Sequence, residues 1–325
     1  MLEPFLRIVG LFIMMGAGFV LFKLKKADAA FSKQLSYTQM MVFYPCMIFT
    51  SLTRQLSFAQ LAEYWILPVA AAGIMILGLA VNALVLRPFN RHWDPRTRRT
   101  ADFCGLMNNY SFLPILLVAS LFGDKAIALV IFAAFGVELV VWTVGVETIS
   151  GAPFKWRSLK NLLTMPMFAI AASIALLAVK HLGFVETDNY PSLRTAFHNI
   201  NGTLHLMGQA TIPASAVVCG IRMANASPAS AFAPRILAMT AIRLLLIPAA
   251  AIALLYPLSL FFPVTMATDS YRVLVIIAVM PTAMASVVMS EIYDGDPLTA
   301  ASAVLSSHIF CLATIPLWLH LLGIV

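Results

Sequence analysis

Charged residues are scarce in this 325-residue chain, at 11% of the composition, whereas hydrophobic residues reach 61%. A soluble domain carries about 25% charged residues. The mean hydropathy is +0.90, so most of the chain faces something other than water. This composition excludes a soluble globular protein. It predicts an all-α polytopic membrane protein, because helices of about 20 apolar residues satisfy their own backbone groups within a bilayer.

Signatures of metal sites, disulfides and enzymes are also lacking. The four cysteines lie in apolar stretches without Cys-x-x-Cys or Cys/His spacing, so we expect neither a disulfide framework nor a bound metal. No His-Glu-x-x-His or aspartate-rich motif is present. Residues 293–296 (Tyr-Asp-Gly-Asp) superficially resemble intramembrane aspartyl protease motifs. Those motifs belong on two helices, whereas these residues form one connector, so we expect no enzyme and no cofactor.

Ten apolar stretches can be drawn as membrane spans. They run roughly over residues 5–22, 36–53, 65–86, 103–121, 126–148, 161–181, 200–221, 236–256, 272–291 and 297–321. The first is followed by lysines rather than preceded by them, which is typical of a membrane helix and not of a cleaved signal peptide.

Basic residues predict the orientation of these spans. Of the 21 lysines and arginines, 14 fall in alternate connectors on one side: Lys23, Lys25, Lys26, Lys33, Arg87, Arg91, Arg96, Arg98, Arg99, Lys155, Arg157, Lys160, Arg222 and Arg235. The positive-inside rule places these in the cytoplasm and both termini outside, on the periplasmic face of the cell inner (plasma) membrane. The net charge of +7 therefore indicates membrane topology and no nucleic-acid partner.

The chain contains signs of an internal repeat. Gly-Asp precedes an apolar span at residues 123–124 and again at 295–296, an offset of 172 residues. The same offset carries Asn108-Asn109 onto Met280-Pro281 within the preceding spans. We therefore predict a first five-span repeat over 1–149, a cytoplasmic connector over 150–160 and a second repeat over 161–325. Because five is odd, the second repeat must be inverted, an architecture of many secondary transporters.

The fourth and ninth spans carry the most informative residues. Two asparagines, a serine and a proline in the fourth span predict a helix that unwinds halfway across the bilayer. The ninth span has a mid-span proline followed by small residues, which let two backbones approach closely. The predicted substrate-binding residues are Asn108, Asn109, Tyr110, Ser111, Pro114, Pro281, Thr282 and Ser286. The alternative is two ordinary kinked helices whose polar groups bond neighbouring helices.

The stretch from Pro281 through Ser286, then residues 291–297 and the alanine-rich final span, resembles the close of the auxin efflux carrier family. Asn-Tyr-Ser-Phe at 109–112 and residues 208–220 are similar to it too. The resemblance implies an inverted repeat in which broken spans 4 and 9 cross. It implies substrates that are small organic anions, such as malate, malonate or auxin-like acids, and dimers are common in the family. One departure is that Pro114 stands where the family often has glycine.

Ionisable residues inside the spans are candidates for ion coupling, since burying them is costly. Glu138 in the fifth span and His308 in the tenth could couple transport to protons, or could be satisfied interior polar groups. Coupling to Na⁺ stays open as well. Arg243 in the eighth span either attracts a substrate carboxylate or, as we favour, snorkels to the cytoplasmic face.

The sequence thus predicts a secondary transporter of small organic anions that works by alternating access. A membrane receptor or sensor for such an anion is one alternative. A cation/proton antiporter of the related fold is another, although such a protein is expected to carry paired mid-membrane aspartates and no span has them. The expected partners are the anion, the lipid bilayer and a second copy in a homodimer.

Overall fold

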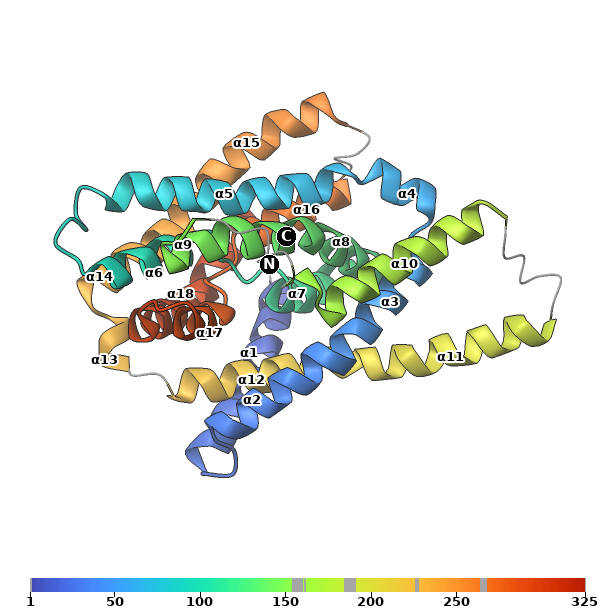
Figure 1. Ribbon diagram of the computed structural model, residues 1–325, viewed down its shortest axis with the longest axis horizontal. Coiled ribbons are helices and arrows are strands. Elements are labelled where there is room, and N and C mark those ends of the chain that lie inside the picture. Colours follow the sequence, from blue (N-terminus) through green and yellow to red (C-terminus); the bar gives the residue numbers. More distant parts are fainter. Residues whose placement is uncertain are drawn as a thin grey trace.

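The computed structural model describes residues 2–153, 160, 162–183, 191–225, 228–263 and 268–324, which fold into helices without a sheet (Figure 1). The first half contains α1 (Leu2–Lys23), α2 (Ala29–Thr38), α3 (Tyr44–Gln55), α4 (Phe58–Glu63), α5 (Ile66–Leu86), α6 (Pro95–Leu106), α7 (Phe112–Phe122), α8 (Asp124–Val140) and α9 (Val146–Ser150). π-Helical turns join α2 to α3 and α8 to α9 into continuous rods.

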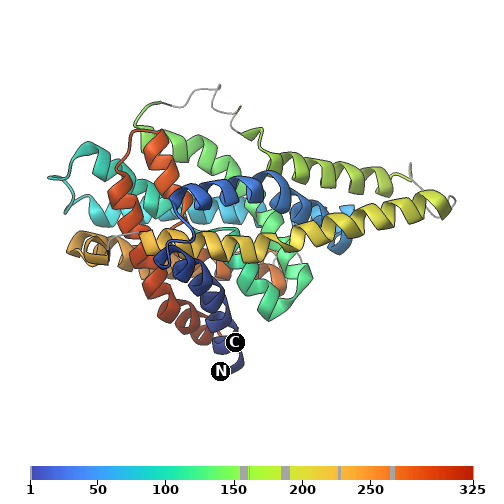
Figure 2. The ribbon, with the colours of Figure 1, turned by 90° about the horizontal axis from the view of Figure 1, so that it is seen from below.

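The second half contains α10 (Met165–His181), α11 (Pro191–Gln209), α12 (Thr211–Asn225), α13 (Pro228–Ala231), α14 (Pro234–Ala241), α15 (Ile247–Phe261), α16 (Thr268–Ala278), α17 (Ala285–Ile292) and α18 (Pro297–Leu321). A π-helical turn joins α14 to α15. Each of the ten predicted ranges falls on one of these helices or on consecutive helices. The N- and C-termini lie near each other in both ribbon views (Figures 1 and 2).

Local sequence explains where several helices begin. Asp94, Thr164 and Asp296 each accept a backbone N–H from the first turn of the helix that follows. A proline stands one or two residues later in all three, where its missing N–H costs nothing. These caps fix the starts of α6, α10 and α18.

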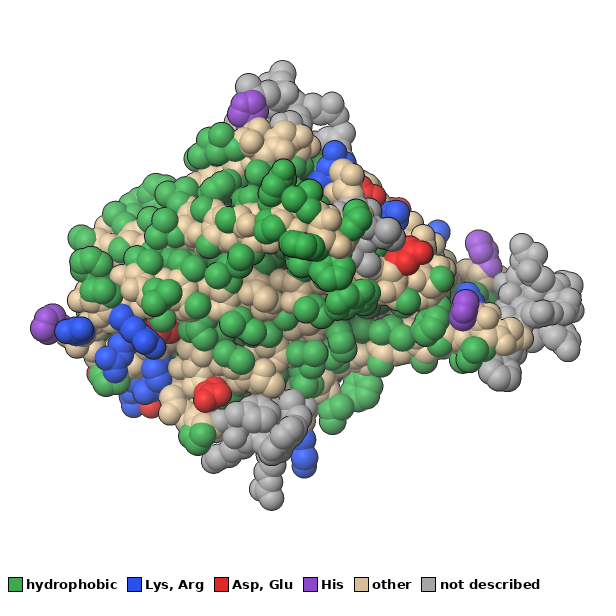
Figure 3. Space-filling model, turned by 90° about the horizontal axis from the view of Figure 1, so that it is seen from above, with side chains coloured by type: hydrophobic (Ala, Val, Ile, Leu, Met, Phe, Trp, Pro, Cys, Tyr) green, Lys and Arg blue, Asp and Glu red, His purple; other side chains and the backbone are tan. Residues whose placement is uncertain are grey.

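The surface is that of a membrane protein. Among the described residues, five helices are long and apolar enough to span a bilayer by length and composition: Phe58–Leu86, Asp124–Ser150, Thr195–Ala224, Pro234–Phe261 and Pro297–Leu321. Shorter apolar helices cover Ile13–Lys23, Phe112–Phe122 and Met165–His181. Figure 3 shows hydrophobic side chains over the middle of one face and a cluster of Lys and Arg side chains at one end.

The helices pack in two groups. In the first, which we call the panel, α1 and α2 pack on α12, and α10 and α11 pack on α3. In the second, the core group, α5 packs on α6 and α8, α15 packs on α16, and α18 packs on α14 and α17. The most buried segments, residues 128–131 of α8 and 273–280 in and after α16, lie in the core group. The two groups meet where α3 contacts α8 and where α1 and α12 contact α7.

Glycine lets α1 and α12 approach closely within the panel. A Cβ built on Gly220 would lie 1.8 Å from the carbonyl oxygen of Met15, whereas one built on Gly16 would meet nothing within 4 Å. Side-chain atoms cannot occupy the first position without moving one helix away from the other. The panel therefore depends on Gly220 and not on Gly16.

We expect Gly220→Ala to lower the thermal unfolding temperature of the detergent-purified protein. Overpacking costs about 1–3 kcal/mol, which outweighs the gain of about 1 kcal/mol in helix propensity. The control is Gly16→Ala, which gains the same propensity without a clash and should unfold at the wild-type temperature or above. Equal melting of the two variants would contradict the close approach.

Candidate functional site

Two of the ten segments are interrupted in the middle. Residues 107–111 separate α6 from α7, and residues 279–284 separate α16 from α17. Pro281 explains the second break, because it donates no hydrogen bond and drives the residue before it out of the helical region. The first break coincides with Asn108, Asn109 and Ser111, whose side chains compete for backbone groups. Pro114 lies in the first turn of α7, outside the break.

The two breaks cross and pair with each other. Asn108 and Thr282 form an antiparallel β-bridge, the Asn109 N–H donates to the Pro281 carbonyl (2.8 Å), and the Ala283 N–H donates to the carbonyl of Met107 (2.9 Å). Unwound backbone in the middle of a membrane protein must find partners inside the protein. Here each broken helix supplies partners for the other, and we call this the crossover.

Arg243 binds the helix ends that meet at the crossover. Its guanidinium donates to the carbonyls of Gly105 in α6 (3.1 Å), Ala278 in α16 (2.8 Å) and Met280 after α16 (3.1 Å). The residue is only 2% exposed, so our preference for snorkelling was wrong. The C-terminal ends of α6 and α16 carry partial negative charge and unpaired carbonyls. The buried guanidinium neutralises this charge and donates hydrogen bonds to these carbonyls.

Gly78 of α5 makes room for this arrangement. A Cβ there would lie 2.4 Å from the Gly105 carbonyl oxygen and 3.4 Å from Nη1 of Arg243. The absence of a side chain at this position lets α5 pack directly against the end of α6. The arginine and the carbonyl can therefore meet in a space too narrow for any larger residue.

The opposite ends at the crossover are the starts of α7 and α17. Neither has a side-chain hydrogen bond from its N-cap residue, Ser111 or Met284. Helix N-termini present unpaired N–H groups and partial positive charge, which attract anions. With Arg243 nearby on the C-terminal ends, the crossover combines two positive helix termini with one full positive charge.

The two asparagines of the first break make different contacts. Asn108 is fully buried and donates its Nδ2 group to the Ile277 carbonyl (2.6 Å), which leaves its Oδ1 without a partner. Asn109 uses Oδ1 as a long (3.4 Å) acceptor for the Leu113 N–H at the start of α7. The side-chain donor of Asn108 thus holds the crossover together. The Nδ2 group of Asn109 remains available as a hydrogen-bond donor.

Glu138 of α8 is joined to the first break. Its two carboxylate oxygens accept hydrogen bonds from the Tyr110 hydroxyl (2.7 Å) and the Trp142 indole N–H (3.0 Å). Tyr110 itself follows Asn109 directly in the break. A proton arriving on Glu138 would compete with these donors for its oxygens, so a change there would reach the crossover through Tyr110.

His308 lies on α18 behind the second break. It is fully buried, its Nδ1 atom lies 2.8 Å from the Val304 carbonyl oxygen, and its Nε2 atom has no partner. The neighbouring Ser307 hydroxyl accepts the Thr282 N–H (3.2 Å). Ser286, in the first turn of α17, is also buried and its hydroxyl has no hydrogen-bond partner. The hydrogen bond of its neighbour Ser307 to Thr282 thus joins this part of α18 to the crossover.

Hydrogen bonds also tie α6 to the loop before α18. The Thr97 hydroxyl donates to Asp296 (2.8 Å), and the Asp296 N–H donates to the Thr100 hydroxyl (2.8 Å). Partial burial opposes ionisation of Asp296, but hydrogen bonds from Thr299 and Thr97 lower the pKa of its carboxyl below the usual value. The carboxylate is therefore a stable acceptor at neutral pH, and it links α6 to the start of α18.

The chain matches a known family of membrane proteins. Residues 5–164 and 190–319 match the family model described as membrane transport protein, which includes the auxin efflux carriers. The chain belongs to this family. Among curated proteins none matches the chain. The family and the apolar helices together make the chain a multi-pass membrane transporter, as expected from the sequence.

The structure places six of the eight predicted site residues of this transporter in the two breaks, and it places Arg243 beside them. Asn108, Asn109, Pro281 and Thr282 meet directly at the crossover. Arg243 was assigned to the wrong environment, because in sequence it lies only nine residues from the arginine-bearing start of α14 and could reach the surface. The signal that would have found it is the general rule that a charge within a span needs an internal partner.

We expect Arg243→Met to lower the free energy of unfolding by about 3 kcal/mol or more, because three buried carbonyls lose a charged donor. The free energy of unfolding of Arg243→Lys should lie between those of the wild type and Arg243→Met, since an ammonium group keeps the charge but lacks the planar fork of the guanidinium. Unfolding in a denaturing detergent measures both. Arg54→Met, which removes an exposed arginine at the end of α3, is the control and should leave stability nearly unchanged. An equal effect of the two methionine variants would contradict the role of Arg243.

Proposed function

We propose that this transporter moves small organic anions, such as mono- or dicarboxylates, and binds them at the crossover. The observation that carries the proposal is the crossover, where the two breaks pair through Asn108 and Thr282, α7 and α17 begin a few residues further along the chain, and the buried Arg243 holds the ends of α6 and α16. A carboxylate is the common biological group that such a positive, hydrogen-bond-donating environment suits. The resemblance to auxin efflux carriers supports malate, malonate or auxin-like acids within that class.

Asn109 is the residue that we assign to substrate recognition. Its Nδ2 group remains available, whereas the corresponding group of Asn108 is held by Ile277. Tyr110, Ser111 and Thr282 lie in the same two breaks and complete the proposed polar surface. Pro281 shapes the second break, while Pro114 and Ser286 lie in the first turns of the half-helices and contribute less directly.

Alternating access requires two bodies that move relative to each other. We assign these roles to the panel and the core group, since the crossover belongs entirely to the core group and the panel contacts it through α3, α1 and α12. A movement of the core group against the panel would then expose the crossover to each side of the membrane in turn. The interface between the groups is where the closing contacts change.

The packing supports the inverted repeat that this mechanism uses. If the first five spans correspond to the last five, every contact between two spans requires a matching contact between their counterparts. The contact of α1 with α12 is matched by that of α10 with α3. The contacts of α5 with α8 and with α6 are matched by those of α14 with α18 and of α15 with α16.

For coupling, we propose Glu138 as a proton-accepting group. It is the carboxylate whose hydrogen bond to Tyr110 connects α8 with the first break. His308 is the second candidate, through Ser307 and Thr282. Proton coupling at either residue predicts a pH-dependent flux, whereas a uniporter or a Na⁺-coupled carrier would not depend on these residues.

We expect Asn109→Ala to abolish the uptake of a radiolabelled dicarboxylate into proteoliposomes. In a thermal-shift screen, the dicarboxylate should no longer stabilise this variant against unfolding. The fold should persist, because the backbone hydrogen bond from Asn109 to Pro281 remains. Pro281→Ala should also abolish transport by allowing the second break to become helical. Asn199→Ala, at an exposed position of α11, is the control and should transport normally. Wild-type flux by both crossover variants would disprove the assignment, and binding without accumulation by the wild type would indicate a sensor.

We expect Glu138→Gln to flatten the dependence of flux on pH. The amide keeps the size of the side chain and an oxygen that can accept from Tyr110, but it no longer titrates. Flux measured in proteoliposomes over a series of external pH values provides the test. If Glu138→Gln shows the full wild-type pH dependence, Glu138 does not couple transport to protons.

A further inference from the structure

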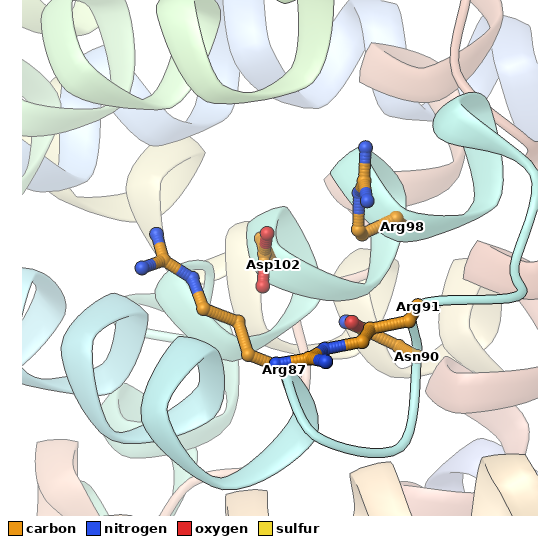
Figure 4. A pocket seen from close by; sticks show the side chains of 5 residues that line it. All are labelled: Arg87, Asn90, Arg91, Arg98 and Asp102. Carbon is orange, nitrogen blue, oxygen red and sulfur yellow. The ribbon is translucent and has the colours of Figure 1, made fainter.

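A second polar site lies away from the crossover, where α5 turns back into α6. A cavity of about 440 Å³ is lined by Arg87 and Arg91 after α5, by Asn90 between them, and by Arg98 and Asp102 of α6 (Figure 4). The close-up shows the carboxylate of Asp102 between the side chains of Arg87 and Arg98. None of these residues takes part in the crossover.

The lining carries an unusual set of groups. The three arginines outnumber the one carboxylate, so the cavity has an excess of positive charge. Asn90 is 1% exposed, and its Nδ2 group has no hydrogen-bond partner although it is buried. A buried donor without a partner is costly, and in a native structure it calls for an explanation. A ligand with acceptor oxygens in the cavity would provide one.

Asp102 narrows the chemistry of this ligand. It accepts a hydrogen bond from the Asn82 side chain (3.2 Å), which leaves acceptor capacity facing the cavity. A simple anion would be repelled by this carboxylate. A ligand that carries a hydroxyl group beside its anionic group would satisfy both the arginines and Asp102.

We propose that this cavity binds a phosphate ester whose carbon skeleton carries a hydroxyl group close to the phosphate, as in a glycerol phosphate. Guanidinium groups bind phosphate oxygens in a bidentate manner, and Asn90 supplies a further donor. The same chemistry occurs in a free phosphate ester and in the headgroup of an anionic lipid. The predicted topology places this turn at the cytoplasmic surface, where anionic headgroups lie.

Binding here would act on the transport machinery from a distance. The ligand would bridge the end of α5 and the α6 residues Arg98 and Asp102, and the last turn of α6 contributes the Gly105 carbonyl that Arg243 holds. Asn82 of α5 already joins these helices through Ala101 and Asp102. A bound phosphate would strengthen that connection and so stiffen the half-helix that leads into the crossover.

The test uses the full chain, purified in an uncharged detergent at low ionic strength so that charge interactions are not screened. In the first arm, sn-glycerol 3-phosphate is titrated by calorimetry into the wild type and into Arg87→Gln and Arg98→Gln. In the second arm, the proteins are taken from nanodiscs of mixed phosphatidylglycerol and phosphatidylcholine, and retained lipid is identified by native mass spectrometry. Both arginines are exposed, so these variants should fold.

We expect each arginine variant to bind the preferred probe about tenfold more weakly, the effect of losing one charge-assisted contact. Lys33→Gln, which removes a positive charge outside the cavity, is the control and should bind like the wild type. Loss confined to the first arm identifies a free phosphate ester, and loss confined to the second identifies a lipid. Absence of binding in both arms, or equal binding by the arginine variants and the wild type, would overturn the proposal.

Discussion

The structure depends on how the carbonyl groups of two interrupted helices are satisfied inside a membrane. Hydrocarbon contains no water that could form hydrogen bonds with these groups, so a broken helix is tolerated only where the protein supplies partners. Arg243 provides them for three carbonyls from two helices, Gly105, Ala278 and Met280. The pairing of Met107–Asn109 with Pro281–Ala283 satisfies part of the remaining unwound backbone. Without these contacts the carbonyl and N–H groups at both breaks would lie unpaired inside the protein, which is costly.

The same arrangement gives the site its electrostatic character. A single cation neutralises the negative ends of α6 and α16, while the N-cap residues of α7 and α17, Ser111 and Met284, make no side-chain hydrogen bond to the helices that they precede. In the function that we propose, stability and anion recognition arise from one geometry. The anion would be bound near the centre of the protein by backbone groups and one amide, without a second charged side chain in the breaks.

Hydrogen bonds and helix α6 connect the crossover to a buried neighbouring helix and to the protein surface. On one side, Tyr110 links it to Glu138 on α8. On the other, α6 is held by Asp296 through Thr97 and Thr100, and its first turns border the arginine-lined cavity. The contacts of Thr97 and Thr100, the cavity-lining Arg98 and the Gly105 carbonyl that Arg243 holds all lie along α6. The proposed phosphate binding at the surface and the proposed anion binding at the centre thus involve the same half-helix.

The sequence alone determined the class of protein and where two helices break. Too few charges for a soluble surface, ten apolar stretches, Asn108-Asn109 and Pro281 are local features, and their consequences for a helix in a bilayer are local as well. Only the tertiary structure decided which breaks pair and which groups remain available. Asn108 and Asn109 are adjacent and chemically identical, yet one is held by Ile277 and the other keeps its donor. Arg243 reaches carbonyls that lie 138 and 35 residues away in the chain, and no local pattern specifies such a contact. The side chain is long enough to reach either water or the interior. It lies in the interior because the carbonyls at the ends of α6 and α16 accept its hydrogen bonds.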